Sequence, residues 1–207
     1  MASKFLALDH TKQQQILNAA MKEFALKGYK AASTNQIVET AGISKGLLFH
    51  YFSNKQGLYF YLYDYCVDVI LEDFFGQIDF DQKDILLRFR EMFLIKLRLM
   101  NKYPVIFDFL IAANVEEATE IKDKLNSLNQ EIIRDSYLKM FTSVDESLFR
   151  SDIDPSKVLD IIIWTIEGIS NKVQAQENHI KAEELRNGKT LQELDGYLEI
   201  LRKTLYN

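Results

Sequence analysis

The sequence has 207 residues, of which 47% are hydrophobic and 27% charged, a balance that suits a globular protein with a substantial core and one large or two small domains. Its single cysteine, Cys66, excludes an intramolecular disulfide and a cysteine-cluster zinc site, and the absence of a long apolar run predicts a cytoplasmic protein without a transmembrane helix or a signal peptide. The net charge of −5 excludes a protein coated in basic charge, yet residues 1–60 hold seven lysines against three acidic residues.

The first quarter of the chain predicts a series of helices separated by tight turns. Thr11 can cap a helix that Gly28 stops. Ser33 or Thr34 can cap a second, shorter helix, and Ser44 can cap a third. Hydrophobic residues recur at helical spacing in each segment, which supports all three assignments.

The rest of the chain continues in the same way. Only 8 glycines and 2 prolines interrupt the sequence, which favours long helices over many short strands. The expected later helices cover about 54–74, 84–100, 103–113, 117–141, 156–173 and 190–205. The predicted fold class is therefore all-α, with about nine helices and no strand.

The stretch "AGISKGLLFHYF", residues 41–52, allows three interpretations. A phosphate-binding Walker loop needs four residues between its glycines and a Lys after the second, whereas only three residues separate Gly42 from Gly46 and Leu47 follows, so that interpretation fails. A metal or catalytic site is not supported, because the three histidines are far apart in the sequence and none has a partner at ligand spacing. Accordingly, no catalytic residue, metal ligand or cofactor is predicted.

The third interpretation is a helix-turn-helix motif. Gly42 allows the positive φ that a tight turn needs, and Ala41 is small where two helices cross closely. Leu48 on the second helix can pack against Ile37 on the first. The second helix of such a motif lies in the major groove of DNA.

Residues 12–62 resemble the DNA-binding head of the tetracycline-repressor (TetR) family of bacterial transcriptional regulators. The markers are "ILNAAMKEFALKGYKAAS", "QIVETAGISKGLLFHYF" and "NKQGLYFYL". The resemblance implies a DNA-binding domain over residues 1–56 and a helical ligand-binding and dimerisation domain over residues 57–207. It implies a homodimer that binds a palindromic operator in double-stranded DNA and acts as a repressor released by a small, largely apolar effector, although the sequence does not decide between repression and activation.

The resemblance also assigns DNA contacts residue by residue. Lys45 can donate to guanine O6 or N7, and Leu47 can pack on a thymine methyl or, almost as readily, in the core. Phe49 stands where the family usually has a Tyr whose hydroxyl reaches a phosphate. No Arg precedes Arg88, so bidentate Arg–guanine contacts are unavailable and affinity should fall steeply with salt. The implied contacts are Ser33, Thr34, Ser44 and Lys55 to phosphates, with Lys45, Leu47, Phe49 and His50 on the recognition helix.

The same resemblance assigns roles to two sets of residues in the second domain. Core packing inside one chain is the alternative for both sets. The last two helices would form the dimer interface through Ile162, Ile166, Gly168, Ile169, Leu194, Leu198 and Leu201. An apolar effector pocket would be lined by Phe89, Phe93, Phe107, Tyr137, Phe141 and Trp164.

Two other classes of function stay open. A helical ligand-binding dimer whose head no longer reads DNA is favoured by Phe49, while the basic charge of residues 1–60 argues against it, unless that charge is a chance fluctuation. An enzyme with an internal helical pocket is disfavoured, because no nucleophile–base pair, cofactor loop or metal cluster is visible in the sequence.

Overall fold

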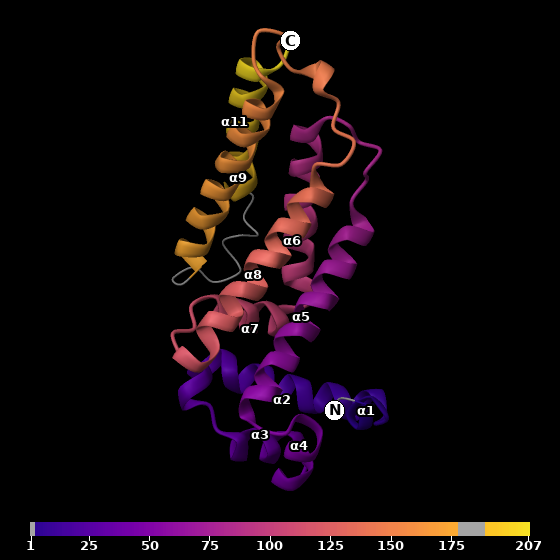
Figure 1. The fold of residues 1–207 in the computed structure, drawn as a ribbon, viewed down its shortest axis with the longest axis vertical. Helices are drawn as coiled ribbons and strands as arrows, with labels where there is room; N and C mark the ends of the chain where they lie inside the picture. The colour runs from indigo at the N-terminus through magenta and orange to yellow at the C-terminus, as the bar shows by residue number, and fades with distance from the viewer. Residues whose placement is uncertain (1–2, 178–188) are drawn as a thin grey trace. The chain divides into compact units, whose positions relative to one another are not determined.

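The computed structural model describes residues 3–177 and 189–207, and within these ranges the chain is all-helical (Figure 1). An isolated β-bridge between Phe149 and Tyr206 is the one extended pairing found there. The helices are α1 (Ser3–Leu6), α2 (His10–Ala31), α3 (Thr34–Ala41), α4 (Lys45–Phe52), α5 (Lys55–Gln77), α6 (Ile85–Lys102), α7 (Pro104–Asn114), α8 (Thr119–Met140), a 3₁₀ turn (Glu146–Leu148), α9 (Pro155–Glu177) and α11 (Lys189–Leu205).

The predicted all-α fold is confirmed, and its nine expected helices correspond to α2–α9 and α11. The short helix α1 was not predicted, because four residues are too few to establish a helical period. The expected cap Thr11 is wrong: Asp9 caps α2, and its Oδ1 accepts a hydrogen bond of 2.9 Å from the amide of Lys12. Gly28 interrupts α2 with a φ of 68° rather than ending it.

The chain divides into two compact units. The first consists of Met1–Phe75 with Leu99–Tyr137, and the second of Gly76–Arg98 with Leu138–Asn207. In the first unit α2 packs against both α3 and α7, so the helices of the predicted DNA-binding part share a core with α7. The predicted division by role at residues 56 and 57 therefore stays a prediction that these units do not test.

An aromatic cluster forms the centre of the first unit. The rings of Phe24 on α2 and Tyr59 on α5 meet edge to face with centroids 4.9 Å apart, and Tyr59 meets Phe109 of α7 at 5.3 Å. All three side chains are buried. Such ring pairs stabilise beyond the area they bury, so this cluster joins α2, α5 and α7 firmly.

In the second unit, α9 and α11 lie side by side (Figure 1). Most of the residues expected at a dimer interface are used to pack these helices within one chain, because Ile162, Ile169, Leu194, Leu198 and Leu201 are buried there. Ile166 is half-buried, and Gly168 is exposed. The exposed large hydrophobic residues of the same helices are Ile161, Trp164, Tyr197 and Ile200, so the assignment of the first set to a dimer interface stays a prediction.

The C-terminal residues are held to the start of α6 by a carboxylate. The Asp84 side chain accepts hydrogen bonds from the Leu86 amide at 3.0 Å, from Arg202 Nη2 at 2.7 Å and from the Tyr206 hydroxyl at 2.9 Å. Burial by itself would raise the pKa of Asp84, but Arg202 and Tyr206 outweigh it and hold the pKa below its usual value.

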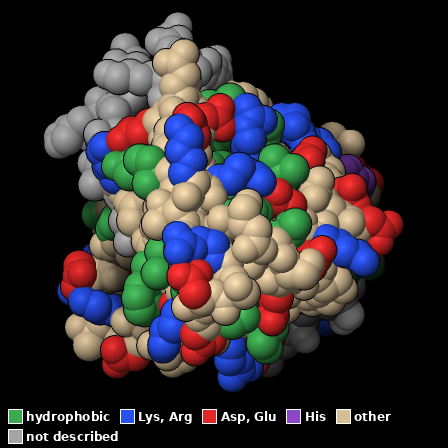
Figure 2. Space-filling view, turned by 90° about the horizontal axis from the view of Figure 1, so that it is seen from above, with side chains coloured by type: hydrophobic (Ala, Val, Ile, Leu, Met, Phe, Trp, Pro, Cys, Tyr) green, Lys and Arg blue, Asp and Glu red, His purple; other side chains and the backbone are tan. Residues whose placement is uncertain are grey.

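Acidic, basic and hydrophobic side chains are interspersed over the face seen in Figure 2, as on an ordinary solvent-exposed surface.

Arg88 on α6 is a buried cation whose partners are backbone carbonyls. Its exposed fraction is 1%. The guanidinium donates hydrogen bonds to carbonyl oxygens at the C-terminal end of α8 and in the loop before α6. Carbonyls at the end of a helix lack hydrogen-bond partners within the helix. It donates to the carbonyl oxygens of Phe80 at 3.2 Å, Gln82 at 2.6 Å, Met140 at 2.9 Å and Thr142 at 2.7 Å.

Replacing Arg88 with Met should destabilise the protein by about 3 kcal/mol or more, because several buried carbonyl oxygens would lose their donor. The free energy of unfolding in urea is the measurement. Arg90→Met on the same helix is the matched control: Arg90 is partly exposed and forms an ion pair of 2.7 Å with Asp195, so its loss should cost at most about 1 kcal/mol. Equal losses from both substitutions would contradict this role of Arg88.

Candidate nucleic-acid interface

Helices α3 and α4 are joined by a tight turn with capped ends. Ser33 caps α3, its Oγ accepting from the Gln36 amide at 3.4 Å. Gly42 ends that helix with a φ of 61°, a left-handed conformation that suits glycine. Ser44 then caps α4, its Oγ accepting from the Leu47 amide at 3.2 Å. The predicted helix-turn-helix geometry is therefore present.

Helix α4 has a buried face and an exposed face. Leu48 and Phe52 are buried in the first unit. Lys45 and His50 are exposed, and Leu47 is 37% exposed, which favours its outward role over core packing. The exposed face of α4 is therefore not covered by the rest of the first unit and can contact the groove of a nucleic acid.

Phe49 and His50 each have a basic neighbour. The ammonium of Lys45 lies 6.0 Å from the centroid of the half-buried Phe49 ring, so that ring lies beside the predicted base-contacting lysine. Lys4 Nζ is 3.3 Å from His50 Nε2. Lys4 belongs to α1, where the buried Phe5 packs on Phe52 with ring centroids 4.9 Å apart. The N-terminal helix thus adds a cation to the exposed face of α4.

The predicted phosphate contacts are only partly free for a ligand. Ser33 and Thr34 are half-buried at the start of α3, while Ser44 is exposed. Lys55 Nζ donates to the carbonyl oxygen of Lys30 at 3.1 Å and lies 4.9 Å from the centroid of a tyrosine ring at the end of α2. Burial lowers the pKa of Lys55, and neighbouring glutamates partly offset that effect.

Two residues that position the motif were missed in the sequence. Lys12 Nζ donates to the carbonyl oxygens of Ala41 at 3.0 Å and Gly42 at 3.2 Å, so α2 holds the turn from outside. Glu23 is buried, accepts from the Ser33 amide at 2.8 Å and pairs with a lysine one turn along α2. Burial would raise the pKa of Glu23, but these donors outweigh it and lower the pKa. Both contacts join residues distant in sequence, which helical periodicity does not reveal.

The six residues predicted for an effector pocket do not all meet within either unit. Phe107 and Tyr137 belong to the first unit, and the other four belong to the second. Phe89 is buried and meets the Phe141 ring edge to face at 5.5 Å, which is ordinary core packing. Trp164 is 64% exposed, on the outer face of α9. These side chains keep a role in a pocket only as a prediction.

No group of three or more His, Cys, Asp or Glu within the described ranges is arranged to hold a metal ion. None of the helices described here is long and apolar enough to cross a membrane.

The α3–turn–α4 arrangement defines a helix-turn-helix protein. Residues 16–62 match the sequence model of the family described as "Bacterial regulatory proteins, tetR family". This match places the helix-turn-helix head of the chain, residues 16–62, in the tetR family of bacterial regulatory proteins.

Individual relatives are similar over the same head. The HTH-type transcriptional repressor AcnR of Corynebacterium diphtheriae is 42% identical over 48 residues, 23% of this chain and 25% of that protein. The uncharacterized HTH-type transcriptional regulator YvkB of Bacillus subtilis is 47% identical over 45 residues, 22% of this chain and 24% of that protein. The match therefore covers only about a quarter of the length of each of these relatives.

The fold continues beyond the head in solved structures. A TetR-like transcriptional regulator from Rhodococcus sp. RHA1 superposes with a TM-score of 0.64, covering 92% of this chain and 93% of the other. The two sequences are 19% identical, so the comparison establishes a shared fold.

Replacing Lys12 with Met should loosen the turn of the motif, because two carbonyl oxygens lose their donor at a cost of about 1–2 kcal/mol. Amide hydrogen exchange should speed up in α3 and α4 more than in α7. Lys22→Met on the exposed face of the same helix is the control and should leave exchange as in the wild type. Unchanged exchange in Lys12→Met would contradict the role of Lys12 in holding the turn.

Proposed function

We propose that the chain is a dimeric DNA-binding transcriptional regulator, and that it represses until a small, largely apolar effector releases it from DNA. The observation that carries the proposal is the exposed face of α4, with Lys45, Leu47 and His50 directed away from the core behind a capped tight turn. The repressor role is supported by the similarity to AcnR, which is named a transcriptional repressor.

In this mechanism α4 enters the major groove of the operator. Lys45 donates to guanine O6 or N7, and Leu47 packs against a thymine methyl. His50 and the neighbouring Lys4 reach a base edge or a phosphate. Phe49 has no hydroxyl to donate, so its ring packs against the sugar edge beside Lys45.

Phosphate contacts come from the helix starts and from lysines. Ser33, Thr34 and Ser44 lie at the N-termini of α3 and α4, where backbone amides and the helix dipole favour anions. An ammonium has three N–H donors, so Lys55 can keep its bond to Lys30 and also reach a phosphate. With lysines and no arginine in residues 1–60, this binding depends on charge pairing that salt weakens.

The proposed dimer uses the outer faces of α9 and α11. Ile161 and Trp164 are one turn apart on α9, and Tyr197 and Ile200 are one turn apart on α11. Gly168, two turns beyond Ile161, is exposed with open space around it. An apolar surface across two adjacent helices suits a four-helix contact with a second copy.

A second candidate function is a helical ligand-binding dimer whose head does not recognise a specific DNA sequence. Phe49 is the observation that favours it, because the ring at this position offers no hydroxyl to a phosphate. Selection of bound sequences from random duplex DNA separates the two candidates.

We expect that selection to enrich one palindromic sequence. Binding to it, followed by fluorescence anisotropy, should weaken roughly a thousandfold between about 50 and 200 mM salt if about six phosphates are contacted. Lys45→Ala should weaken binding about tenfold or more, since it removes a base contact, while Lys22→Ala on the exposed face of α2 should not. Enrichment of no sequence at low salt would instead favour the second candidate.

Replacing Ile200 with Glu should convert the dimer to a monomer, because a charge would be buried against the partner's apolar face. The mass in solution, measured by light scattering after size exclusion, gives the result directly. Leu138→Glu is the matched control, since Leu138 in the same unit is 70% exposed, comparable to Ile200 at 61%. A dimer that persists in Ile200→Glu would locate the interface elsewhere.

A further inference from the structure

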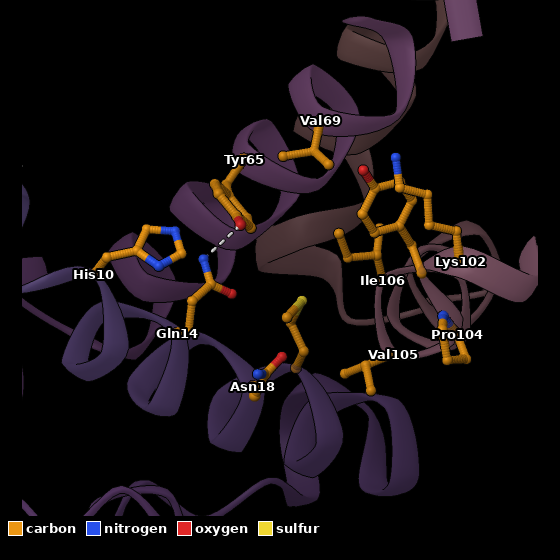
Figure 3. Close-up of a pocket in the computed structure, with 11 residues that line it drawn as sticks. His10, Gln14, Asn18, Tyr65, Val69, Lys102, Pro104, Val105 and Ile106 are labelled. Atoms are coloured by element: carbon orange, nitrogen blue, oxygen red, sulfur yellow. Dashed lines mark hydrogen bonds between the residues drawn. The ribbon is translucent and has the colours of Figure 1, made fainter. Parts of the chain in front are cut away.

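A groove of about 420 Å³ lies entirely within the first unit (Figure 3). One wall is a stripe of α2 residues spaced one turn apart, a second is a pair on α5, and the third is the corner where α6 ends and α7 begins. The eleven lining residues are His10, Gln14, Asn18, Met21, Tyr65, Val69, Lys102, Tyr103, Pro104, Val105 and Ile106. None of the residues predicted for an effector pocket is among them.

The groove combines apolar walls with polar groups from each side. Met21, Val69 and Ile106 supply apolar surface. Gln14 Nε2 donates to the Tyr65 hydroxyl at 3.0 Å, a hydrogen bond that crosses from α2 to α5 (Figure 3). The volume and this mixture are typical of a small-molecule site.

The lining contains a lysine, which pairs with an acidic residue just outside the lining. None of its eleven residues is acidic, and Lys102 lies at the corner of α6 and α7. The Lys102 ammonium is held 2.7 Å from Asp73, which also accepts from the Tyr103 hydroxyl at 2.9 Å. The bond to Asp73 raises the pKa of Lys102 to about 12, so the side chain stays protonated. An ammonium has three N–H donors, so Lys102 can bind a carboxylate while it keeps Asp73.

The same corner also contributes a helix N-terminus. No side chain caps α7, whose first residues Pro104, Val105 and Ile106 line the groove. Pro104 has no amide hydrogen, so the donors at this helix start are the amides of Val105 and Ile106, and such amides favour negative charge. The cation and the helix start therefore select the same kind of ligand group.

The wall formed by α2 connects the groove to the helix-turn-helix motif. Lys12, two residues before Gln14, donates to both carbonyl oxygens at the turn between α3 and α4. Helix α2 also packs along α3. A ligand bound between α2, α5 and α7 would therefore act on the helix that holds the turn.

We propose that this groove is the effector site, and that its ligand is a small carboxylic acid with an apolar tail or ring. The carboxylate binds Lys102 and the start of α7, and the apolar part lies along Met21, Val69 and Ile106. Helix α2 would take one position in the DNA-bound protein and another in the free protein. A ligand that binds the second arrangement more tightly than the first lowers the affinity for DNA. This inference rests on the proposed function for its regulatory consequence, but not for the binding itself.

Calorimetric titration of the full chain with three probes of one chain length, decanoate, decanol and decylamine, tests the binding. Decanoate should saturate one site per chain, decanol should bind about tenfold more weakly, and decylamine should not bind, because only decanoate offers Lys102 a charge-assisted hydrogen bond. Equal binding of the three probes, or no saturable binding of decanoate, would overturn the proposal.

Matched variants locate the site. Val69→Phe should weaken decanoate about tenfold by narrowing the groove, whereas Val67→Phe, the same change on the same helix outside the lining, should not. Lys102→Gln, at an exposed position that tolerates change, should weaken decanoate about tenfold and leave decanol unaffected. Lys122→Gln, also at an exposed ion pair, is its control. Decanoate binding that neither Val69→Phe nor Lys102→Gln weakens would overturn the assignment.

A separate measurement tests the coupling to DNA. At a decanoate concentration equal to a few times its Kd for the wild type, decanoate should lower the affinity of the wild type for its selected duplex about fivefold and change that of Val69→Phe much less. Calorimetric binding without any change in DNA affinity would overturn the regulatory part of the inference. Failure of the wild type to bind any duplex would count against the proposed function alone, since the calorimetric result stands independently of DNA.

Discussion

The position of α2 is the constraint on which the rest of the first unit depends. Near its beginning, Lys12 holds the turn of the helix-turn-helix motif through two carbonyl oxygens. Further along, Glu23 holds the amide of Ser33, where α3 begins. One helix therefore fixes both ends of α3, and a displacement of α2 changes the support of the whole motif.

The far end of α2 is held just as firmly. Gly28 takes a φ of 68°, and the next amide, of Tyr29, donates to Glu116 Oε2 at 2.7 Å. The other oxygen of Glu116 accepts from the Ala118 amide at 2.8 Å, at the start of α8. A residue with a Cβ would be strained in that backbone conformation, so glycine is needed where α2 bends toward this carboxylate. Contacts at both ends make α2 a rigid element rather than a loose arm.

The sequence predicted the elements of the head well, because its signals there are local. Ser33, Gly42 and Ser44 act within three residues of their own positions, as caps and as a turn residue, and each was confirmed. The assigned DNA contacts stay predictions, although the exposure of Leu47 agrees with the assigned side of α4. The TetR family resemblance and the all-α fold were confirmed by the family match and the helices.

The arrangement of residues 57–207 was harder to predict from the sequence, for a physical reason. Helices α9 and α11 carry hydrophobic residues on more than one face. One stripe, which includes Ile162 and Leu198, packs within the chain, and another, which includes Ile200, remains exposed. Periodicity alone did not distinguish the two stripes. Nor could aromatic content identify a pocket, because Phe89 fills core space while Trp164 faces outward. The groove beside α2 combines residues more than 80 positions apart, from His10 to Ile106, and only the packing of α2 against α7 brings them together.

In the proposed regulator, the amino-acid composition of residues 1–60 makes DNA recognition depend on how α2 supports the helix-turn-helix motif. Lysine is a point charge on a flexible stem, whereas arginine fixes its own geometry through a planar fork. With no arginine in residues 1–60, the direction of each DNA contact must come from the backbone that carries it. Charge pairing with phosphates is largely independent of sequence, so specificity in such a head depends on how α4 is held in the groove. A modest change at α2 can then alter recognition without touching any residue that contacts DNA, which is the property an effector-controlled regulator requires.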